Sequence, residues 1–412
     1  MMVNDKNLLT VDYKKDFPLL AAKDVAYLDN SATTQKPQCV IDAECNFYLK
    51  HNANPLRGLY ELAMEATDAY EDARVAVQRF INAKSEQEII FTRNASESLN
   101  LVAYSYGLAN LKPGDEIVTT IMEHHSNMLP WRMVAEKTGA VLKYIECAAD
   151  GSVSDEAIEA AVTEKTKLVA MAEVSNVLGR LNPIGKLIEE AHKVGAVAVI
   201  DAAQSAPHMA IDVQKMDADF LAFSGHKMLG PMGIGVLYGK KELLEAMPPF
   251  LRGGEMISFV SRDGQEYAPL PHKFEAGTVN AAGAVGLHAA IYYINSIGFD
   301  VIEAREEALT KLAFDAMQKI EGVHIIGGQT AEEHKGIITF TIDGVHPHDI
   351  AAIMDADGVN IRAGNHCAQP LLDHLCTGAT ARASVAFYNT QEDVERFIKC
   401  LSTIRERMGY GR

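Results

Sequence analysis

The stretch Phe220-Leu221-Ala222-Phe223-Ser224-Gly225-His226-Lys227 runs from four apolar residues into a short polar tip that ends in a lysine. We interpret it as a strand that delivers Lys227 onto a loop at the edge of a sheet. A partly desolvated lysine next to another basic group has a lowered pKa and can attack a carbonyl carbon. The stretch therefore predicts a Schiff-base lysine, and pyridoxal phosphate is the usual partner of such a lysine. Taken alone, it also fits a solvated loop lysine.

Two earlier apolar runs support this interpretation. Residues 168–174 and 196–200 show no alternation of polar and apolar side chains, which is typical of strands buried on both faces of a parallel sheet. Asn176 follows the first run, and Asp201 follows the second with Gln204 three residues later. Ligands of open α/β sheets bind at the carboxyl ends of strands, so we expect these side chains near Lys227. Asp201 would keep the pyridine nitrogen protonated; its alternative role is a helix N-cap.

The order of the motifs along the chain indicates a family. Asp201, Gln204 and residues 224–227 are followed by Arg362-Ala363-Gly364-Asn365-His366-Cys367-Ala368. This series closely resembles the cysteine desulfurases of the class V aminotransferase family, specifically the SufS-like members of the NifS/SufS group. The resemblance extends from about residue 28 to the C-terminus.

The resemblance implies a fold and a reaction. The implied fold is α/β, pyridoxal-phosphate fold type I (aspartate aminotransferase-like), with a large, mixed and mostly parallel sheet domain and a smaller α/β C-terminal domain. The implied reaction takes sulfur from L-cysteine, which leaves L-alanine and a persulfide on Cys367 that passes to an acceptor for iron–sulfur cluster assembly. Selenocysteine lyase activity, cysteine sulfinate activity and a class V aminotransferase without an essential thiol remain alternatives.

Length and composition agree with a large two-domain enzyme. The chain has 412 residues, of which 48% are hydrophobic, and a formal net charge of −17. We expect a cofactor-binding domain over 21–280 and a small domain over 281–412, packed with 1–20, that carries the cysteine loop. The acidic balance argues against nucleic acid or an anionic membrane as partner. Without a signal-peptide pattern, an apolar run of ~18 residues or a CxxC pair, we expect a cytosolic protein with reduced thiols.

Periodicity and turn residues predict the remaining elements. Strands are expected at 89–92, 116–120, 234–238, 323–326, 337–342, 359–362 and 381–387, helices at 37–50, 183–195, 282–297, 301–320 and 348–356, and a long functional loop at 251–276.

The segment Asn94-Ala95-Ser96-Glu97 predicts a helix start with a capping box between Asn94 and Glu97. Backbone amides at a helix N-terminus bind anions, although the segment equally fits a plain helix start. In the family this place holds the cofactor phosphate, which makes Ala95 and Ser96 the expected phosphate ligands.

The resemblance adds further cofactor contacts. It implies that Ser224 and His226 contact the cofactor and that Thr278 reaches the phosphate of the other subunit of a homodimer. The alternative for the segment around Thr278 is a glycine turn between elements. Asn176 and Gln204 would bind the ring oxygen or the substrate.

Two adjacent histidines follow the strand at 116–120. The resemblance implies that His124 stacks on the cofactor ring and transfers protons. An imidazole that titrates near neutrality suits both roles. We interpret His125 as structural.

The second chemical centre is Cys367. Its small, polar neighbours predict a flexible and accessible loop, where a thiolate can attack the substrate sulfur. Arg382 and Arg362 are the expected ligands of the substrate carboxylate, Arg382 in bidentate geometry. The alternative for Arg382 is a surface salt bridge. A zinc site formed by His366, Cys367, His374 and Cys376 is the rival interpretation of this region, although its spacing is not that of a standard zinc finger; we expect no metal.

The chain departs from the family pattern at three positions. Leu56 and Tyr60 replace histidines common in SufS-like relatives, and Asn365 replaces the first histidine of Gly-His-His-Cys. Roles of those histidines do not transfer to this chain. In relatives served by a zinc-bearing SufU-type acceptor, a histidine at the place of His348 can bind the acceptor's zinc. We therefore expect His348 to face an acceptor of SufU or SufE type.

Overall fold

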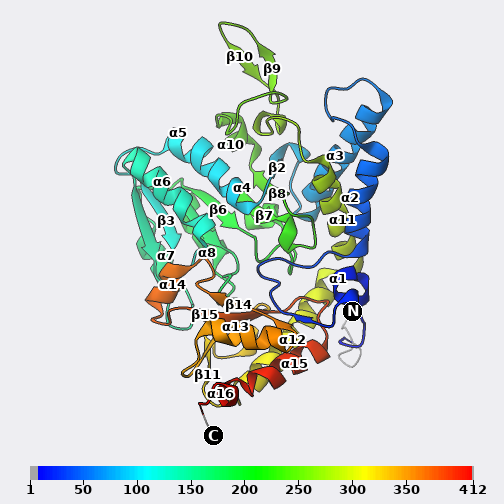
Figure 1. Cartoon of the computed structure of the whole chain (residues 1–412). Helices are drawn as coiled ribbons and strands as arrows, with labels where there is room; N and C mark the ends of the chain where they lie inside the picture. Colours follow the sequence, from blue (N-terminus) through cyan, green and yellow to red (C-terminus); the bar gives the residue numbers. More distant parts are fainter. Residues whose placement is uncertain (1–7, 411–412) are drawn as a thin grey trace.

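The computed structural model describes residues 8–410 and contains two main sheets, drawn one above the other in Figure 1. The larger sheet has seven strands in the order β2-β8-β7-β6-β5-β3-β4. All neighbours are parallel except β8, which is antiparallel to β2 and β7. The strands are β2 Ile89–Thr92, β3 Glu116–Thr120, β4 Val141–Ile145, β5 Thr166–Ala172, β6 Val197–Asp201, β7 Phe220–Ser224 and β8 Gly235–Gly239. The mixed, mostly parallel sheet predicted from the sequence is confirmed.

Strand β7 shows why this sheet is a central layer. All five of its residues are buried. Leu221 and Phe223 belong to a hydrophobic cluster on one face, whereas Phe220 and Ala222 belong to a cluster on the other face. Successive side chains of a strand point to opposite faces, so a continuous apolar run fits a sheet that is covered on both sides.

Helices cover both faces of the large sheet. One cluster includes residues of α2 Gln38–Asn46, α3 Glu61–Phe80, α7 Asp155–Ala161, α8 Ile184–Lys193, α9 Val213–Met216 and α11 Ala281–Ile297. The opposite cluster includes residues of α4 Ala95–Leu101, α6 Leu129–Thr138 and α10 Lys241–Ala246, and α5 Leu108–Asn110 lies beside them. The result is a three-layer α/β/α arrangement.

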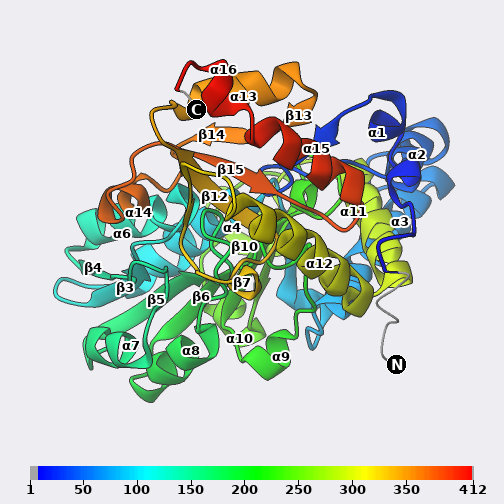
Figure 2. The same ribbon diagram turned by 90° about the horizontal axis from the view of Figure 1, so that it is seen from below.

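The smaller sheet has four antiparallel strands in the order β11-β12-β15-β14. They are β11 Val323–Ile326, β12 Ile337–Ile342, β14 Arg362–Gly364 and β15 Thr380–Ser384. A separate hydrophobic cluster joins β11, β12 and β15 to α12 Phe299–Met317, α13 Pro347–Ala356, α15 Gln391–Leu401 and α16 Ile404–Arg407. Figure 2 shows these helices over the small sheet, with α14 Gln369–His374 at its edge.

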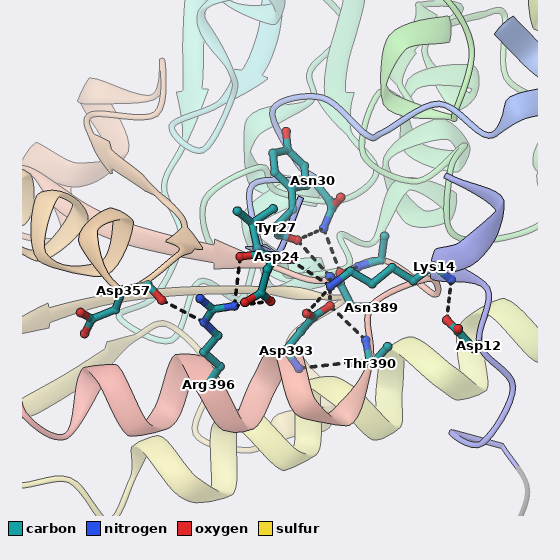
Figure 3. Close-up of polar contacts among 12 residues, drawn as sticks. Asp12, Lys14, Asp24, Tyr27, Asn30, Asp357, Asn389, Thr390, Asp393 and Arg396 are labelled. Atoms are coloured by element: carbon teal, nitrogen blue, oxygen red, sulfur yellow. Dashed lines mark hydrogen bonds and ion pairs between the residues drawn. The ribbon is translucent and has the colours of Figure 1, made fainter. Parts of the chain in front are cut away.

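The early part of the chain is joined to its late part. Strand β1, Ala26–Tyr27, pairs in parallel with β13, Val359–Asn360, and the short helix α1, Pro18–Ala22, precedes it. Lys14 Nζ lies 2.8 Å from Asp393 Oδ1, and Arg396 Nη1 lies 2.9 Å from Asp24 Oδ1 (Figure 3). The domain boundaries given above stay a prediction. α11 packs on α2 and α3, whereas Ala26 and Leu28 belong to the core of the small sheet.

Several predicted elements differ in detail. The strand expected at 359–362 is two strands, β13 and β14, that pair with different partners. The helix expected at 37–50 passes into a π-helical turn at Phe47–His51. The loop at 251–276 contains a projecting hairpin of β9, Ile257–Val260, and β10, Gln265–Tyr267 (Figure 1). The capping box is incomplete, because the Glu97 carboxylate binds the amide of Arg93 and not that of Asn94.

Across residues 8–410, no single helix is long and apolar enough to cross a bilayer. The pair α11 and α12, which is bent by 79° at the break between the helices, passes the same length and composition test only when taken together.

Candidate functional site

A cavity of about 580 Å³ lies at the carboxyl ends of the parallel strands, where the small domain closes over them. Most residues singled out from the sequence line it: Ala95, Ser96, His124, Asn176, Asp201, Gln204, Ser224, His226, Lys227, Arg362, Cys367 and Arg382. The expectation that these polar strand tips lie close to Lys227 is therefore met by the structure, as the rule for parallel sheets predicts. The individual roles of these residues stay predictions.

Lys227 ends a short turn that follows β7, and the preceding carbonyl group is tightly held. The His226 oxygen accepts hydrogen bonds from Lys36 Nζ at 2.8 Å, Thr33 Oγ1 at 3.0 Å and the Thr34 amide at 3.1 Å. Burial lowers the pKa of Lys227 to about 8, although the charge of Asp201 opposes the shift. The uncharged, nucleophilic fraction of this amine at neutral pH is therefore larger than that of an ordinary lysine, although the charged form still predominates.

Asp201 lies at the tip of β6 and is 5% exposed. Its Oδ1 accepts a hydrogen bond from the amide of Ala203 at 2.9 Å, which is the local turn contact expected of a cap-like aspartate. Burial raises the pKa of this carboxyl, whereas the Ala203 amide and Lys227 act in the opposite direction. Gln204 binds the carbonyl of Ser31 at 2.8 Å and so joins the site to the segment after β1.

The N-terminus of α4 forms the wall of the cavity opposite the small domain. The Asn94 side chain accepts a hydrogen bond from the Glu97 amide at 3.0 Å, as a helix cap does. The Ala95 amide donates to Ser224 Oγ at 2.8 Å, and Ser96 Oγ lies 2.6 Å from Ser126 Oγ. Hydroxyl groups and the backbone amides of a helix N-terminus are groups that bind phosphate.

His124 is partly buried in the wall of the cavity. Its Nδ1 accepts a hydrogen bond from the Ser126 amide at 3.1 Å. Burial lowers the pKa of His124 to about 3, and the charges of Lys227, His125 and Arg382 add to the shift. The ring is therefore neutral at physiological pH, and the expectation that it titrates near neutrality is wrong for this state of the protein.

Glu123 is a residue that the sequence analysis missed. It is fully buried beneath the site and accepts hydrogen bonds from Thr120 Oγ1 at 2.7 Å, Asn127 Nδ2 at 2.6 Å and the Ala172 amide at 2.9 Å. Burial raises the pKa of Glu123 to about 8. It ties the tip of β3 to the end of β5, but the pattern Glu-His-His gave no signal of this role.

The Cys367 loop is accessible and also docked. Cys367 is exposed, and both His366 and Cys367 have positive φ, 50° and 54°. Left-handed backbone at non-glycine residues is unfavourable and persists only where contacts enforce it. Here the His125 amide donates to the Cys367 oxygen at 2.7 Å, Asn176 Nδ2 donates to the His366 oxygen at 2.8 Å, and the Gln369 amide donates to His125 Nε2 at 3.3 Å. His125, interpreted from sequence as structural, is thus a docking point for the loop.

Two arginines from the small sheet share one carboxylate. Arg362 Nη2 lies 2.8 Å and Arg382 Nη2 3.5 Å from the carboxylate oxygens of Asp29. Arg382 is only 3% exposed, which rules out a surface salt bridge, and its Nε has no hydrogen-bond partner among residues 8–410. Burial lowers the pKa of Arg382 to about 10, so it stays charged at neutral pH. A buried cation with an open donor is a suitable anchor for a carboxylate.

Thr278 and His348 lie outside this cavity. Thr278 lines a second cavity of about 410 Å³ together with Arg93 and Phe250. The rival zinc site is not assembled, because His374 Nε2 binds the Cys147 carbonyl at 2.8 Å and His366 Nε2 lies 2.9 Å from Thr380 Oγ1. Within residues 8–410, no three His, Cys, Asp or Glu side chains are placed to hold a metal ion.

Comparison with known proteins gives a consistent result. Residues 26–397 match the family described as aminotransferase class-V. A protein of Halalkalibacterium halodurans named "probable cysteine desulfurase" is 51% identical over 97% of this chain and 98% of its own length. The apo structure of a cysteine desulfurase from Thermococcus onnurineus NA1 superposes with a TM-score of 0.92 at 42% identity and covers 99% of both chains. The cysteine desulfurase CsdA of Escherichia coli gives a TM-score of 0.90 at 38% identity, over 99% of this chain and all of the other.

Proposed function

The chain belongs to the aminotransferase class-V family, in its NifS/SufS group of cysteine desulfurases, and we propose that it supplies sulfur from L-cysteine for iron–sulfur cluster assembly. The observation that carries the proposal is one cavity that brings together Lys227, Asp201, Arg382 and Cys367. A lysine amine, a buried carboxylate, a carboxylate-binding arginine and an accessible thiol are the groups that this reaction requires.

The residues of the cavity fit pyridoxal phosphate, the cofactor of this enzyme. Lys227 offers an amine of lowered pKa for the aldehyde, and Asp201 offers a carboxylate for the pyridine nitrogen. Ala95 and Ser96 would hold the phosphate, Ser224 and His226 would contact the cofactor, and His124 would lie against the ring. When bound, the cofactor withdraws electrons from the Cα atom of an amino acid joined to it.

The chain's own residues would then act as follows. Arg382 binds the carboxylate of L-cysteine and orients the amino acid above Lys227. Lys227 Nζ takes the Cα proton and returns a proton to the product. Cys367 Sγ attacks the substrate sulfur. The Cβ–S bond breaks with its electron pair left on Cβ, which is protonated to give alanine, and the new S–S bond leaves a persulfide on Cys367.

The decisive experiment compares Cys367→Ser with the wild type and with Cys376→Ser, which removes another exposed cysteine nine positions away. Alanine production from L-cysteine is measured with dithiothreitol as sulfur acceptor, and the absorption band of the lysine-bound cofactor is recorded. We expect Cys367→Ser to keep the band and lose sulfur transfer, and Cys376→Ser to keep both. A fully active Cys367→Ser enzyme would exclude the proposed sulfur carrier.

We further propose that the enzyme works as a homodimer. Thr278 is exposed and lies away from the Lys227 cavity, as a residue that serves a second subunit would. Apolar side chains also lie exposed near the start of α3: Leu49 at 78%, Leu59 at 95%, Tyr60 at 58%, Leu62 at 44% and Met64 at 51%. Such a concentration is typical of an interface. Sedimentation equilibrium should give twice the chain mass, and Leu59→Glu together with Met64→Glu should shift it towards the monomer.

The proposed acceptor is a SufU-type or SufE-type protein. His348 supports this proposal because it is exposed at the start of α13, with its ring centroid 5.0 Å from that of His346. Calorimetric titration with each acceptor should separate the two types. For a zinc-bearing acceptor, His348→Ala should weaken sulfur transfer at least tenfold, whereas His324→Ala, at another exposed histidine, should not. The cytosolic location expected from the composition belongs to the same proposal.

A further inference from the structure

Lys36 is a partly buried lysine that lies just before α2 and reaches the turn that carries Lys227. Its Nζ donates hydrogen bonds to the Thr34 carbonyl at 2.6 Å and to the His226 carbonyl at 2.8 Å, the latter 190 positions away in the chain. Among residues 8–410 no carboxylate forms an ion pair with this amine. Removing a lysine from water is costly unless it is paired, so charge pairing does not explain the position of this side chain.

The turn after β7 is held by contacts that leave one of its peptide units aside. The Gly225 amide donates to the Ile234 carbonyl at 2.9 Å, and the Met228 amide donates to the Gly225 carbonyl at 3.0 Å. Neither contact involves the peptide unit between His226 and Lys227. That unit is planar, so the direction of its carbonyl group fixes where the Lys227 side chain begins.

The carbonyl oxygen of His226 is held by the segment 33–36, which supplies all its partners among the described residues. Lys36 Nζ donates to it at 2.8 Å, Thr33 Oγ1 at 3.0 Å and the Thr34 amide at 3.1 Å, and Thr34 Oγ1 lies 3.2 Å away. Lys36 is the one donor of this set that can carry a charge, and a charged donor forms a stronger hydrogen bond than a neutral one. The peptide unit before Lys227 therefore depends most on Lys36.

The backbone from which Lys36 extends is itself fixed. Pro37 follows Lys36, and the residue before a proline is restricted to extended conformations. The Gln35 amide donates to the hydroxyl of Tyr388 at 3.0 Å, and Tyr388 is fully buried. The Lys36 amine thus links a rigid part of the early chain to the turn of Lys227.

We propose that Lys36 is a positioning residue of the desulfurase reaction, which holds the peptide unit between His226 and Lys227 and so keeps the Lys227 amine in reach of the Cα proton of the amino acid. Lys36 does not line the cavity and acts through Lys227. Once the amine is released from the cofactor, only the Lys227 chain determines where it lies. A misplacement of about 1 Å can lower a rate roughly 10²-fold. The inference deepens the proposed function, on which it rests.

The test follows a proton transfer that needs no sulfur. In deuterium oxide, proton NMR measures the rate at which the enzyme with its cofactor exchanges the Cα proton of L-alanine. L-alanine carries no sulfur, so Cys367 takes no part in this exchange. A second readout starts from cofactor-free protein and records the rate at which the band of the lysine-bound cofactor appears after mixing with pyridoxal phosphate. Both rates depend on where the Lys227 amine lies.

Four variants are compared with the wild type. Lys36→Met removes the donor at similar length, Lys36→Gln is a shorter, polar replacement in case Lys36→Met does not fold, and Lys36→Arg keeps the charge and the donors. Thr33→Val is the matched control, because it removes an uncharged donor to the same oxygen at nearly constant size. Urea unfolding and the amount of bound cofactor show whether each variant is folded and loaded.

We expect Lys36→Met and Lys36→Gln to lower both rates by at least about tenfold, with the KM for L-alanine and the amount of bound cofactor unchanged. Lys36→Arg should recover most of the loss, and Thr33→Val should lower the rates by no more than about twofold.

Wild-type rates in Lys36→Met, an equal loss in Thr33→Val, or a Lys36→Arg enzyme as slow as Lys36→Met would overturn the proposal. So would a lower amount of bound cofactor with an unchanged exchange rate per bound cofactor, which is the sign of a merely structural role. Failure of the proposed function would appear differently, as absence of alanine production from L-cysteine by the wild type.

Discussion

Arg74→Met should be among the most damaging substitutions outside the active site. Arg74 is fully buried in α3, and its guanidinium donates to Glu275 at 2.7 Å and 2.8 Å and to the Ile89 carbonyl at 2.8 Å. Glu275 also accepts from the Tyr70 hydroxyl at 2.8 Å and the Phe91 amide at 2.7 Å. The pair therefore joins α3 and β2 to the segment that leads into Thr278.

The magnitude follows from burial. The Glu275 side chain is 2% exposed, so loss of Arg74 leaves a carboxylate with two uncharged donors, the His272 ring at 3.8 Å and almost no water. Breaking such a pair by removal of one partner costs about 3–5 kcal/mol. That is a large share of the roughly 5–15 kcal/mol by which a folded protein is stable. Replacing both residues, as Arg74→Met/Glu275→Gln, should recover part of the loss, because the one carboxylate that then lacks Arg74 is that of Glu71, which is 33% exposed to water.

The free energy of unfolding can be measured by urea denaturation. The single tryptophan, Trp131, is buried in the helical layer beside the large sheet and reports on that domain by fluorescence. Lys193→Met is the control. Lys193 forms an ion pair with Glu189, and the two side chains are 53% and 62% exposed. Exposed pairs of this kind contribute about 0–1 kcal/mol to stability. If Arg74→Met loses no more unfolding free energy than this control does, the argument from burial is refuted.

Three further predictions concern the surroundings of the site. Burial lowers the pKa of Lys36 from 10.5 to about 7. Between pH 7 and pH 10.5 the unfolded chain therefore binds one proton more than the folded protein, and the free energy of unfolding rises with pH. Lys36→Met should lack this rise. Urea unfolding of the wild type and of Lys36→Met at pH 7 and pH 9 should show that the difference between their free energies of unfolding changes by on the order of 1 kcal/mol per pH unit. His125→Ala should leave the cofactor band unchanged and raise the rate at which iodoacetamide alkylates Cys367 about fivefold. A fivefold change is expected from the loss of one hydrogen bond, that of the His125 ring to the Cys367 loop, which contributes about 1 kcal/mol. An unchanged rate would mean that the ring does not hold the loop. In Gly235→Ala the new Cβ would lie 2.4 Å from the backbone at the start of α4. This clash should lower the free energy of unfolding by about 1–3 kcal/mol and weaken cofactor binding. In the control Gly185→Ala the new Cβ meets no atom within 4 Å, so the change should be neutral or stabilising.

Much of the large sheet and the location of the cavity could be predicted, because both depend on local pattern. The apolar run at β6 ends in Asp201, the run at β7 ends in a turn to Lys227, and the rule for parallel strands brings their tips together. Strand β4 gave no comparable signal, since it lies at the edge of the sheet and only one of its five residues is buried.

The rest of the site depends on contacts between distant segments, which no local pattern encodes. Asp29 reaches Arg362 across 333 positions, and the docking of the Cys367 loop on His125 depends on how the two domains meet. The protonation of His124 was wrongly expected for a related reason. Its pKa is set by the burial that the assembled domains impose, and the adjacent residues in sequence do not reveal that burial.

The pairing of Lys14 with Asp393 has a consequence for synthesis on the ribosome. All strands of the large sheet lie between residues 89 and 239, so they emerge while the partners of Lys14 and of β1 are still untranslated. A nascent chain can therefore form the strand tips that carry Asp201 and Lys227 well before it contains Cys367. The early segment pairs only after the last part of the chain is made, and the reactive thiol joins the pocket together with Arg362 and Arg382, after the strand tips of the large sheet are in place.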